Sequence, residues 1–179
     1  MPASPAEQTA ELVRHYRWLR QYGLNDSHSG NASLRDGDRM WVTPSGCCAD
    51  LLAADDLLAA PIDAPLHAAV YRACPQARAV LHCHPPHLLA LTFDGDDFVP
   101  RDFEGELYFP RIPVVSIPFN RYVADAPAMV AELLAEYTVA VVRGHGLYAR
   151  GDSINLAYKW CCSVELSAHI ELLTRAQSK

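Results

Sequence analysis

The sequence AVLHCHPPH, residues 79–87, joins a short apolar run to two histidines and a pair of prolines. An apolar run of this length next to turn-forming residues is typical of a buried β-strand, which we expect over residues 78–84. Alternate side chains of a strand share one face, so His82 and His84 should project side by side while Cys83 faces away. A short helix is expected directly afterwards, over residues 86–91.

Two imidazoles on one strand face form a bidentate clamp for a divalent transition metal. A third histidine, His145, follows the apolar run VAVV at residues 139–142. Its neighbours Gly144 and Gly146 permit the close backbone approach that a buried metal centre requires. Three neutral imidazoles that leave one coordination position open are typical of a catalytic metal site. We therefore predict that His82, His84 and His145 bind a metal.

The alternative for any single histidine is an ordinary surface position or a hydrogen-bonded core position. The remaining histidines lack a comparable setting, so we interpret them in this way. They are His15, His28, His67, His87 and His169.

Helical and strand patterns alternate along the rest of the chain. Helices are expected over residues 6–22, after Asp63, over 125–137 and after a cap at Asp152-Ser153. Further strands are expected over residues 113–118 and 138–142. Hairpins are expected around DGD (residues 36–38) and near Arg150-Gly151. Without a linker or repeat, this order predicts a single domain over residues 1–179, a three-layer α/β/α fold with a mostly antiparallel central sheet.

Composition limits the classes of partner. The 179 residues carry a net charge of −6 and no basic run, which argues against binding to nucleic acid or an anionic membrane. No apolar stretch reaches the roughly 18 residues of a membrane span, and the N-terminus has no secretory signal pattern. The six cysteines form no C-x-x-C motif and suggest reduced thiols. We expect a cytoplasmic protein with a small-molecule substrate.

Five motifs occur in the order found in the class II aldolase/adducin family, which the chain resembles over about residues 10–170. They are SGNAS (29–33), VTPSG (42–46), LHAAVYR (66–72), AVLHCH (79–84) and GHG (144–146). The best-known enzyme of this family is L-fuculose-1-phosphate aldolase. The resemblance implies that His82, His84 and His145 are zinc ligands, although another divalent transition metal would suit them. It also implies a homotetramer with active sites between subunits.

By the same resemblance, the catalytic carboxylate is Asp63. Fuculose-type aldolases carry Glu at this position, whereas the related ribulose-5-phosphate 4-epimerases carry Asp. Three roles stay open for Asp63: a proton-transfer group, a fourth metal ligand, or a plain helix N-cap.

The family places two serines before that carboxylate to hold a substrate phosphate, but here they are Pro61 and Ile62. Neither side chain can donate a hydrogen bond. The donors left for an anion are Asn31, Ser45 and the backbone at Gly46. The alternative is that these residues form two ordinary turns.

The resemblance implies reversible aldol cleavage of a small hydroxy-carbonyl compound, a sugar or sugar phosphate, through an enediolate that the metal stabilises. Family members often add a tyrosine as the acid, and the candidates here are Tyr108, Tyr122 and Tyr148. Glu104 and Glu106 are interpreted as solvated loop charges. Two alternatives to an aldolase stay open. One is an epimerase, dehydratase or decarboxylase on the same scaffold. The second is a non-catalytic adducin-like interaction protein, although such a protein would not need all three histidines.

Overall fold

The computed structural model describes residues 4–61 and 65–177, and seven strands in this part of the chain form one sheet. The strands are β1 Asn31–Asp36, β2 Arg39–Val42, β3 Leu58–Pro61, β4 Ala79–Cys83, β5 Val114–Val115, β6 Val139–Val142 and β7 Gly146–Gly151. Their order across the sheet is β3-β2-β1-β4-β7-β6-β5. Only the β5–β6 pair is parallel. The predicted mostly antiparallel sheet is therefore confirmed.

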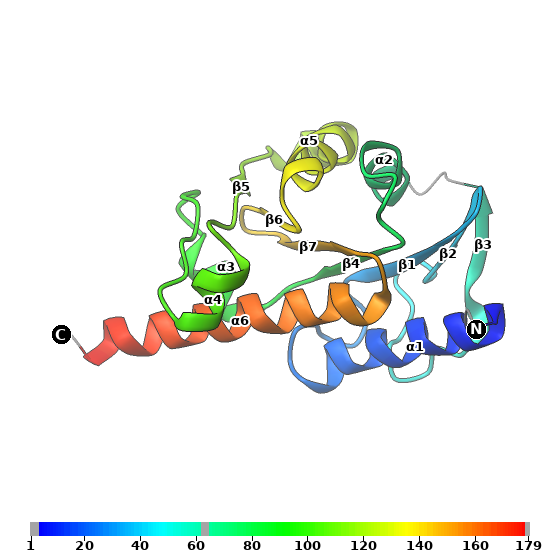
Figure 1. Cartoon of the computed structure of the whole chain (residues 1–179), viewed down its shortest axis with the longest axis horizontal. Helices are drawn as coiled ribbons and strands as arrows, with labels where there is room; N and C mark the ends of the chain where they lie inside the picture. Colours follow the sequence, from blue (N-terminus) through cyan, green and yellow to red (C-terminus); the bar gives the residue numbers. More distant parts are fainter. Residues whose placement is uncertain (1–3, 62–64, 178–179) are drawn as a thin grey trace.

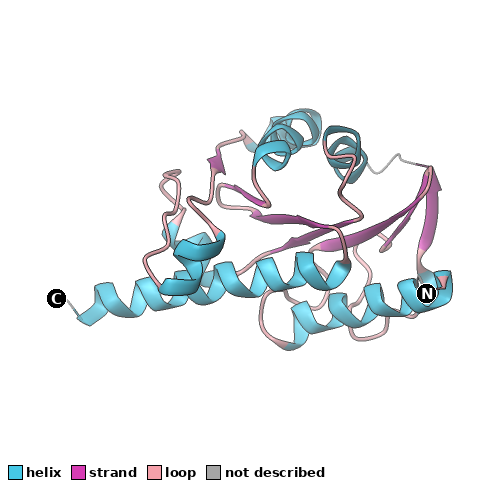
Figure 2. Cartoon of the chain, viewed as in Figure 1, coloured by secondary structure: helices cyan, strands magenta, loops and turns pink. Residues whose placement is uncertain are grey.

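Helices cover both faces of this sheet (Figures 1 and 2). On one side lie α1 (Pro5–Gln21) and α6 (Ile154–Gln177), with the short helices α3 (Pro86–Leu91) and α4 (Phe103–Tyr108) against α6. On the other side lie α2 (Pro65–Ala73) and α5 (Tyr122–Glu136). Two 3₁₀ turns, η1 Ala54–Asp56 and η2 Phe119–Arg121, complete the described elements. None of the helices in these described ranges combines the length and the apolar character needed to cross a membrane.

The sheet separates two apolar cores, and β4 contributes to both. Leu81 and Cys83 pack into the core beneath α1 and α6, whereas Val80 packs into the core beneath α2 and α5. Because side chains alternate along a strand, His82 and His84 lie on the same side as Val80. The predicted strand face is thus directed toward the α2–α5 layer.

Local sequence signals explain where the two long helices begin. Ser4 and Glu7 form a reciprocal capping box at α1: the Glu7 amide donates to Ser4 Oγ and the Ser4 amide donates to the Glu7 carboxylate. At the start of α6, Ser153 Oγ accepts from the Leu156 amide at 3.2 Å. The predicted cap at Asp152-Ser153 is confirmed.

The hairpin predicted near Arg150-Gly151 is wrong. The chain turns instead at residues 143–145, where Gly144 has a φ of +63°, and β7 then runs antiparallel to β6. Gly151 is the last residue of β7, and a Cβ atom there would lie 2.8 Å from the Ala157 amide nitrogen of α6. The glycine permits close packing of strand and helix, not a reversal of the chain.

Three other elements differ from expectation. The strand expected over residues 113–118 is reduced to Val114–Val115, between two prolines that cannot donate ladder hydrogen bonds. The strand β3 and the helix α4 were not predicted. Glu104 and Glu106 lie on α4 instead of in a loop, and both are exposed to solvent as expected.

Candidate metal centre

Three histidines meet where β4 ends and β6 turns into β7. One ligand nitrogen from each of His82, His84 and His145 lies within 4.8 Å of the other two. The Nε2 atoms of His82 and His145 are 3.0 Å apart. The ring centroid of His84 lies 4.6 Å from that of His82 and 5.4 Å from that of His145. The structure thus brings together the three predicted ligands in a cluster that can hold a metal ion.

Backbone contacts orient the two histidines of β4. His82 Nδ1 donates to the Leu147 carbonyl at 3.0 Å, which leaves the Nε2 lone pair free for a metal. The His84 amide lies 2.8 Å from the Leu24 carbonyl and 3.0 Å from Asn25 Oδ1 and donates to both. Asn25 is buried and was not predicted from the sequence. Its position in a polar turn was the only signal, since its partner His84 is 59 residues away.

Gly146 allows this close assembly. A Cβ atom at residue 146 would overlap His82 Cε1 and would lie 2.9 Å from His84 Cδ2. Any side chain at this position would therefore displace two of the three candidate ligands. Gly146 thus meets the expectation that a glycine beside His145 permits the backbone to approach the other two histidines closely.

Burial keeps the three imidazoles uncharged. Desolvation lowers the pKa of His82, and the neighbouring His84 and His145 lower it further. Desolvation also lowers the pKa of His84, and it lowers the pKa of His145 to about 4. At neutral pH the cluster offers nitrogen lone pairs without positive charge, a donor set that fits a divalent transition metal.

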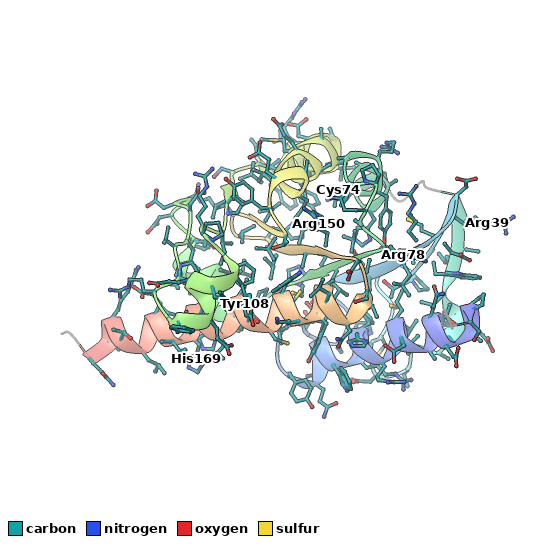
Figure 3. All side chains as sticks on the ribbon, viewed as in Figure 1. Arg39, Cys74, Arg78, Tyr108, Arg150 and His169 are labelled. Carbon is teal, nitrogen blue, oxygen red and sulfur yellow. The ribbon has the colours of Figure 1, made fainter. Side chains whose placement is uncertain are left out.

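Two of the three candidate tyrosines reach this cluster. The Tyr148 ring stacks on His82 with centroids 4.1 Å apart, and the Tyr122 ring stacks on His145 at 4.4 Å. The two phenol hydroxyls are hydrogen-bonded to each other, and burial raises the pKa of both. Tyr108 is the last residue of α4 and lies on the other side of the sheet next to α6, with its ring 5.4 Å from that of Trp160 (Figure 3).

A cavity of about 460 Å³ is lined by all three residues predicted to bind an anion, Asn31, Ser45 and Gly46. Asn31 is the register partner of His82 across the β1–β4 pair. A smaller cavity of about 160 Å³ is lined by Asn31, Tyr122 and Tyr148. His67, which was expected to be an ordinary residue, lines both cavities. Asp63 lies outside the described residues, as does Ile62.

Together, the sheet with its two helical layers and the histidine cluster define an α/β protein with a candidate divalent-metal site. The sequence matches the family described as Class II Aldolase and Adducin N-terminal domain over residues 10–172. The chain belongs to this family, and the resemblance found in the sequence is confirmed.

Relatives of known name agree with this membership. The crystal structure of L-fuculose-1-phosphate aldolase from Thermus thermophilus is 30% identical, covers 97% of each chain and superposes with a TM-score of 0.89. Methylthioribulose-1-phosphate dehydratase from Yersinia enterocolitica is 28% identical over 94% of this chain and 92% of its own. The enzyme of the same name from Klebsiella pneumoniae strain 342 is 26% identical over 94% and 96%. The chain is thus an enzyme of the class II aldolase superfamily.

Proposed function

We propose that this protein is a metal-dependent lyase that catalyses reversible aldol cleavage of a small hydroxy-carbonyl compound, a sugar or sugar phosphate. The observation that carries the proposal is the cluster of His82, His84 and His145, whose sheet neighbour Asn31 lines a cavity together with Ser45 and Gly46. The likeness to the Thermus thermophilus aldolase supports this choice of reaction.

We propose zinc as the ion that the three histidines hold, since three imidazoles suit Zn²⁺ and leave a position for substrate. When bound, the metal would supply Lewis-acid chemistry toward a carbonyl and an adjacent hydroxyl oxygen. The side-chain amide nitrogen of Asn31, Ser45 and the Gly46 backbone would hold the far end of the substrate, whether phosphate or another polar group.

Proton transfer is assigned to Asp63 and Tyr122. Asp63 would accept a proton from the substrate hydroxyl, as the family resemblance implies. Tyr122 is half-buried and lines the small cavity, so its phenol would return a proton to the nascent product. Tyr148 is almost fully buried behind Tyr122 and orients that phenol through their shared hydrogen bond. The raised pKa of Tyr122 keeps its proton in place at neutral pH.

Dehydration is the second candidate, and the curated relatives named methylthioribulose-1-phosphate dehydratases favour it. The same residues would remove a proton next to the carbonyl, but a hydroxyl would leave instead of a carbon fragment. Incubating the zinc-loaded protein with L-fuculose 1-phosphate and with methylthioribulose 1-phosphate separates the reactions by mass spectrometry. Aldol cleavage gives two carbonyl products, whereas dehydration gives one product lighter by a water. Neither product, together with no bound metal, would favour a non-catalytic adducin-like role.

We also propose that residues 1–179 act as one domain in a cytoplasmic homotetramer. The family resemblance supports the tetramer. Sedimentation at micromolar concentration tests it, because a species of 19.7 kDa alone would contradict it.

A further inference from the structure

A buried chain of hydrogen bonds determines which nitrogen of His67 carries the proton. The Tyr71 hydroxyl lies 2.8 Å from Ser33 Oγ, which lies 2.7 Å from His67 Nδ1. Within the described residues, Ser33 is the acceptor available to the Tyr71 proton, so Tyr71 donates to Ser33. Ser33 must then donate its own proton to His67 Nδ1.

The neutral ring of His67 therefore presents an N–H at Nε2. Burial lowers the pKa of His67 to about 4, so the ring is neutral at pH 7. The Nε2 atom is buried and has no hydrogen-bond partner among residues 4–61 and 65–177. A buried donor without an acceptor is costly, so this N–H is suited to a group that arrives with a ligand.

An acceptor lies in the same place without a partner. Asn31 Oδ1 is buried and is likewise unpaired within the described part of the chain. Asn31 and His67 both line the large cavity and the small one. Asn31 is also the sheet neighbour of His82. Both side chains line the cavity that Ser45 also lines.

We infer that His67 Nε2–H and Asn31 Oδ1 together recognise one uncharged hydroxyl group of the substrate. The inference rests on the proposed function, and it makes His67 a specificity-determining residue. A hydroxyl both accepts and donates, so it satisfies both atoms at once. A phosphate or carboxylate oxygen would accept from His67 but would be repelled by Asn31 Oδ1. A carbonyl oxygen would leave Asn31 unpaired.

The test uses metal-chelating hydroxamates that differ in their carbon-bound hydroxyl groups. Acetohydroxamate has none, glycolohydroxamate has one on the same two-carbon chain, and glyceric hydroxamate has two on a three-carbon chain. Their binding to the zinc-loaded protein is measured by calorimetry. We expect at least one hydroxylated probe to bind about tenfold more tightly than acetohydroxamate, the scale of pairing two buried polar groups. The His67→Leu variant should bind all three within about twofold, because it lacks the donor.

Two further variants separate recognition from a structural role. His67→Gln keeps an N–H donor near the Nε2 position and should keep most of the preference for the hydroxyl. His15→Gln is the matched control, because His15 is also buried but bonds the Glu11 carbonyl beneath the opposite face of the sheet. It should lower thermal stability without altering the preference. Nitrogen-15 NMR should show the His67 proton on Nε2 in the parent.

The outcomes are distinguishable from those of the proposed function. If acetohydroxamate itself does not bind the zinc-treated parent, that result contradicts the proposed metal centre and the hydroxyl site together. If acetohydroxamate binds but added hydroxyls bring no gain, only the present inference is overturned. It is also overturned if His67→Leu lowers stability yet preserves the preference, or if the His67 proton is found on Nδ1.

Discussion

The ring of Tyr148 lies flat on the ring of His82, with centroids 4.1 Å apart and planes within 6° of parallel. Tyr122 covers His145 in a similar way, and the two phenol hydroxyls bond each other. The candidate metal ligands are therefore packed on one side by a pair of proton-bearing groups. Both rings pack against the ligands, so a substitution that removes only a hydroxyl can separate the role of packing from the role of proton transfer.

The Tyr122→Phe substitution removes the hydroxyl but keeps the ring against His145. Metal content should stay at the parent level, while turnover should fall about 10²-fold, the usual scale for losing a general acid. Tyr108→Phe is the matched control, because Tyr108 packs against Trp160 away from the site. Equal turnover of the two variants would remove Tyr122 from the proposed mechanism.

Replacing both His82 and His84 by Ala should remove bound zinc, which we expect at about one ion per parent chain. Loss of two of three ligands leaves too few donors, while the two apolar cores stay in place. Elemental analysis of purified protein measures the ion, and circular dichroism checks the fold. His87→Ala is a control from the same motif, since His87 pairs with Glu165 at 2.6 Å and should not affect the metal. Zinc retention by the double variant would refute the ligand assignment.

Gly146→Ala should weaken zinc binding by tenfold or more, because the new methyl group would overlap the rings of His82 and His84. Competition with a colorimetric chelator gives the affinity. Gly37→Ala is a useful comparison: its φ is +59°, but no atom lies within 4 Å of the added Cβ. That variant should lose about 1 kcal/mol of stability and no affinity for zinc. Similar zinc affinities in both variants would contradict the steric explanation.

For Asp63, the informative change is Asp63→Asn, since Asn caps helices about as well as Asp. If Asp63 transfers a proton, metal content should be unchanged and turnover should fall at least about 10²-fold. Loss of metal together with activity would make it a fourth ligand. A rate within about threefold of the parent, with metal retained, would leave only the capping role.

The acid sensitivity of the metal-free protein should depend on His67. Its folded-state pKa of about 4 lies below the ordinary value of 6.5, so between these values the unfolded chain binds a proton that the folded chain does not. The free energy of unfolding should thus fall as the pH drops from about 6.5 to 4, by roughly 3 kcal/mol from this residue. His67→Gln should lose that part of the pH dependence. Urea titrations of both proteins, with a chelator present, give the free energy of unfolding at pH 7 and at pH 4.5. An equal change in this free energy between the two pH values in both proteins would contradict the prediction.

The central strand and the ligand pair were predictable because one local rule governs both. Alternation along AVLHCH places apolar residues and histidines on defined faces, and β4 lies in the middle of the sheet with neighbours on each side. The first hairpin followed from DGD, where Gly37 takes the left-handed conformation. His145 was predicted from the apolar run before it and the glycines beside it, and the order of the family motifs supported that prediction, although no local rule relates residues so distant in sequence.

The parts that were missed depend on contacts across long sequence separations. Strand β7 begins and ends with glycine, so its pattern indicated a turn, although the glycines serve packing against His82 and α6. Asn25 and His67 look like ordinary polar residues until their partners His84 and Ser33 are placed beside them. Propensity and periodicity carry no information about such pairs.

The alternation along β4 also ties metal acquisition to correct strand pairing. A slip of β4 by one residue against β1 and β7 would turn His82 and His84 into the core beneath α6 and bring Cys83 out toward the cavity. A misregistered chain could keep much of its helix content and still lose the ion. Bound zinc would then report that the central strands are paired in the correct register. A spectroscopic measure of secondary structure would not detect this difference.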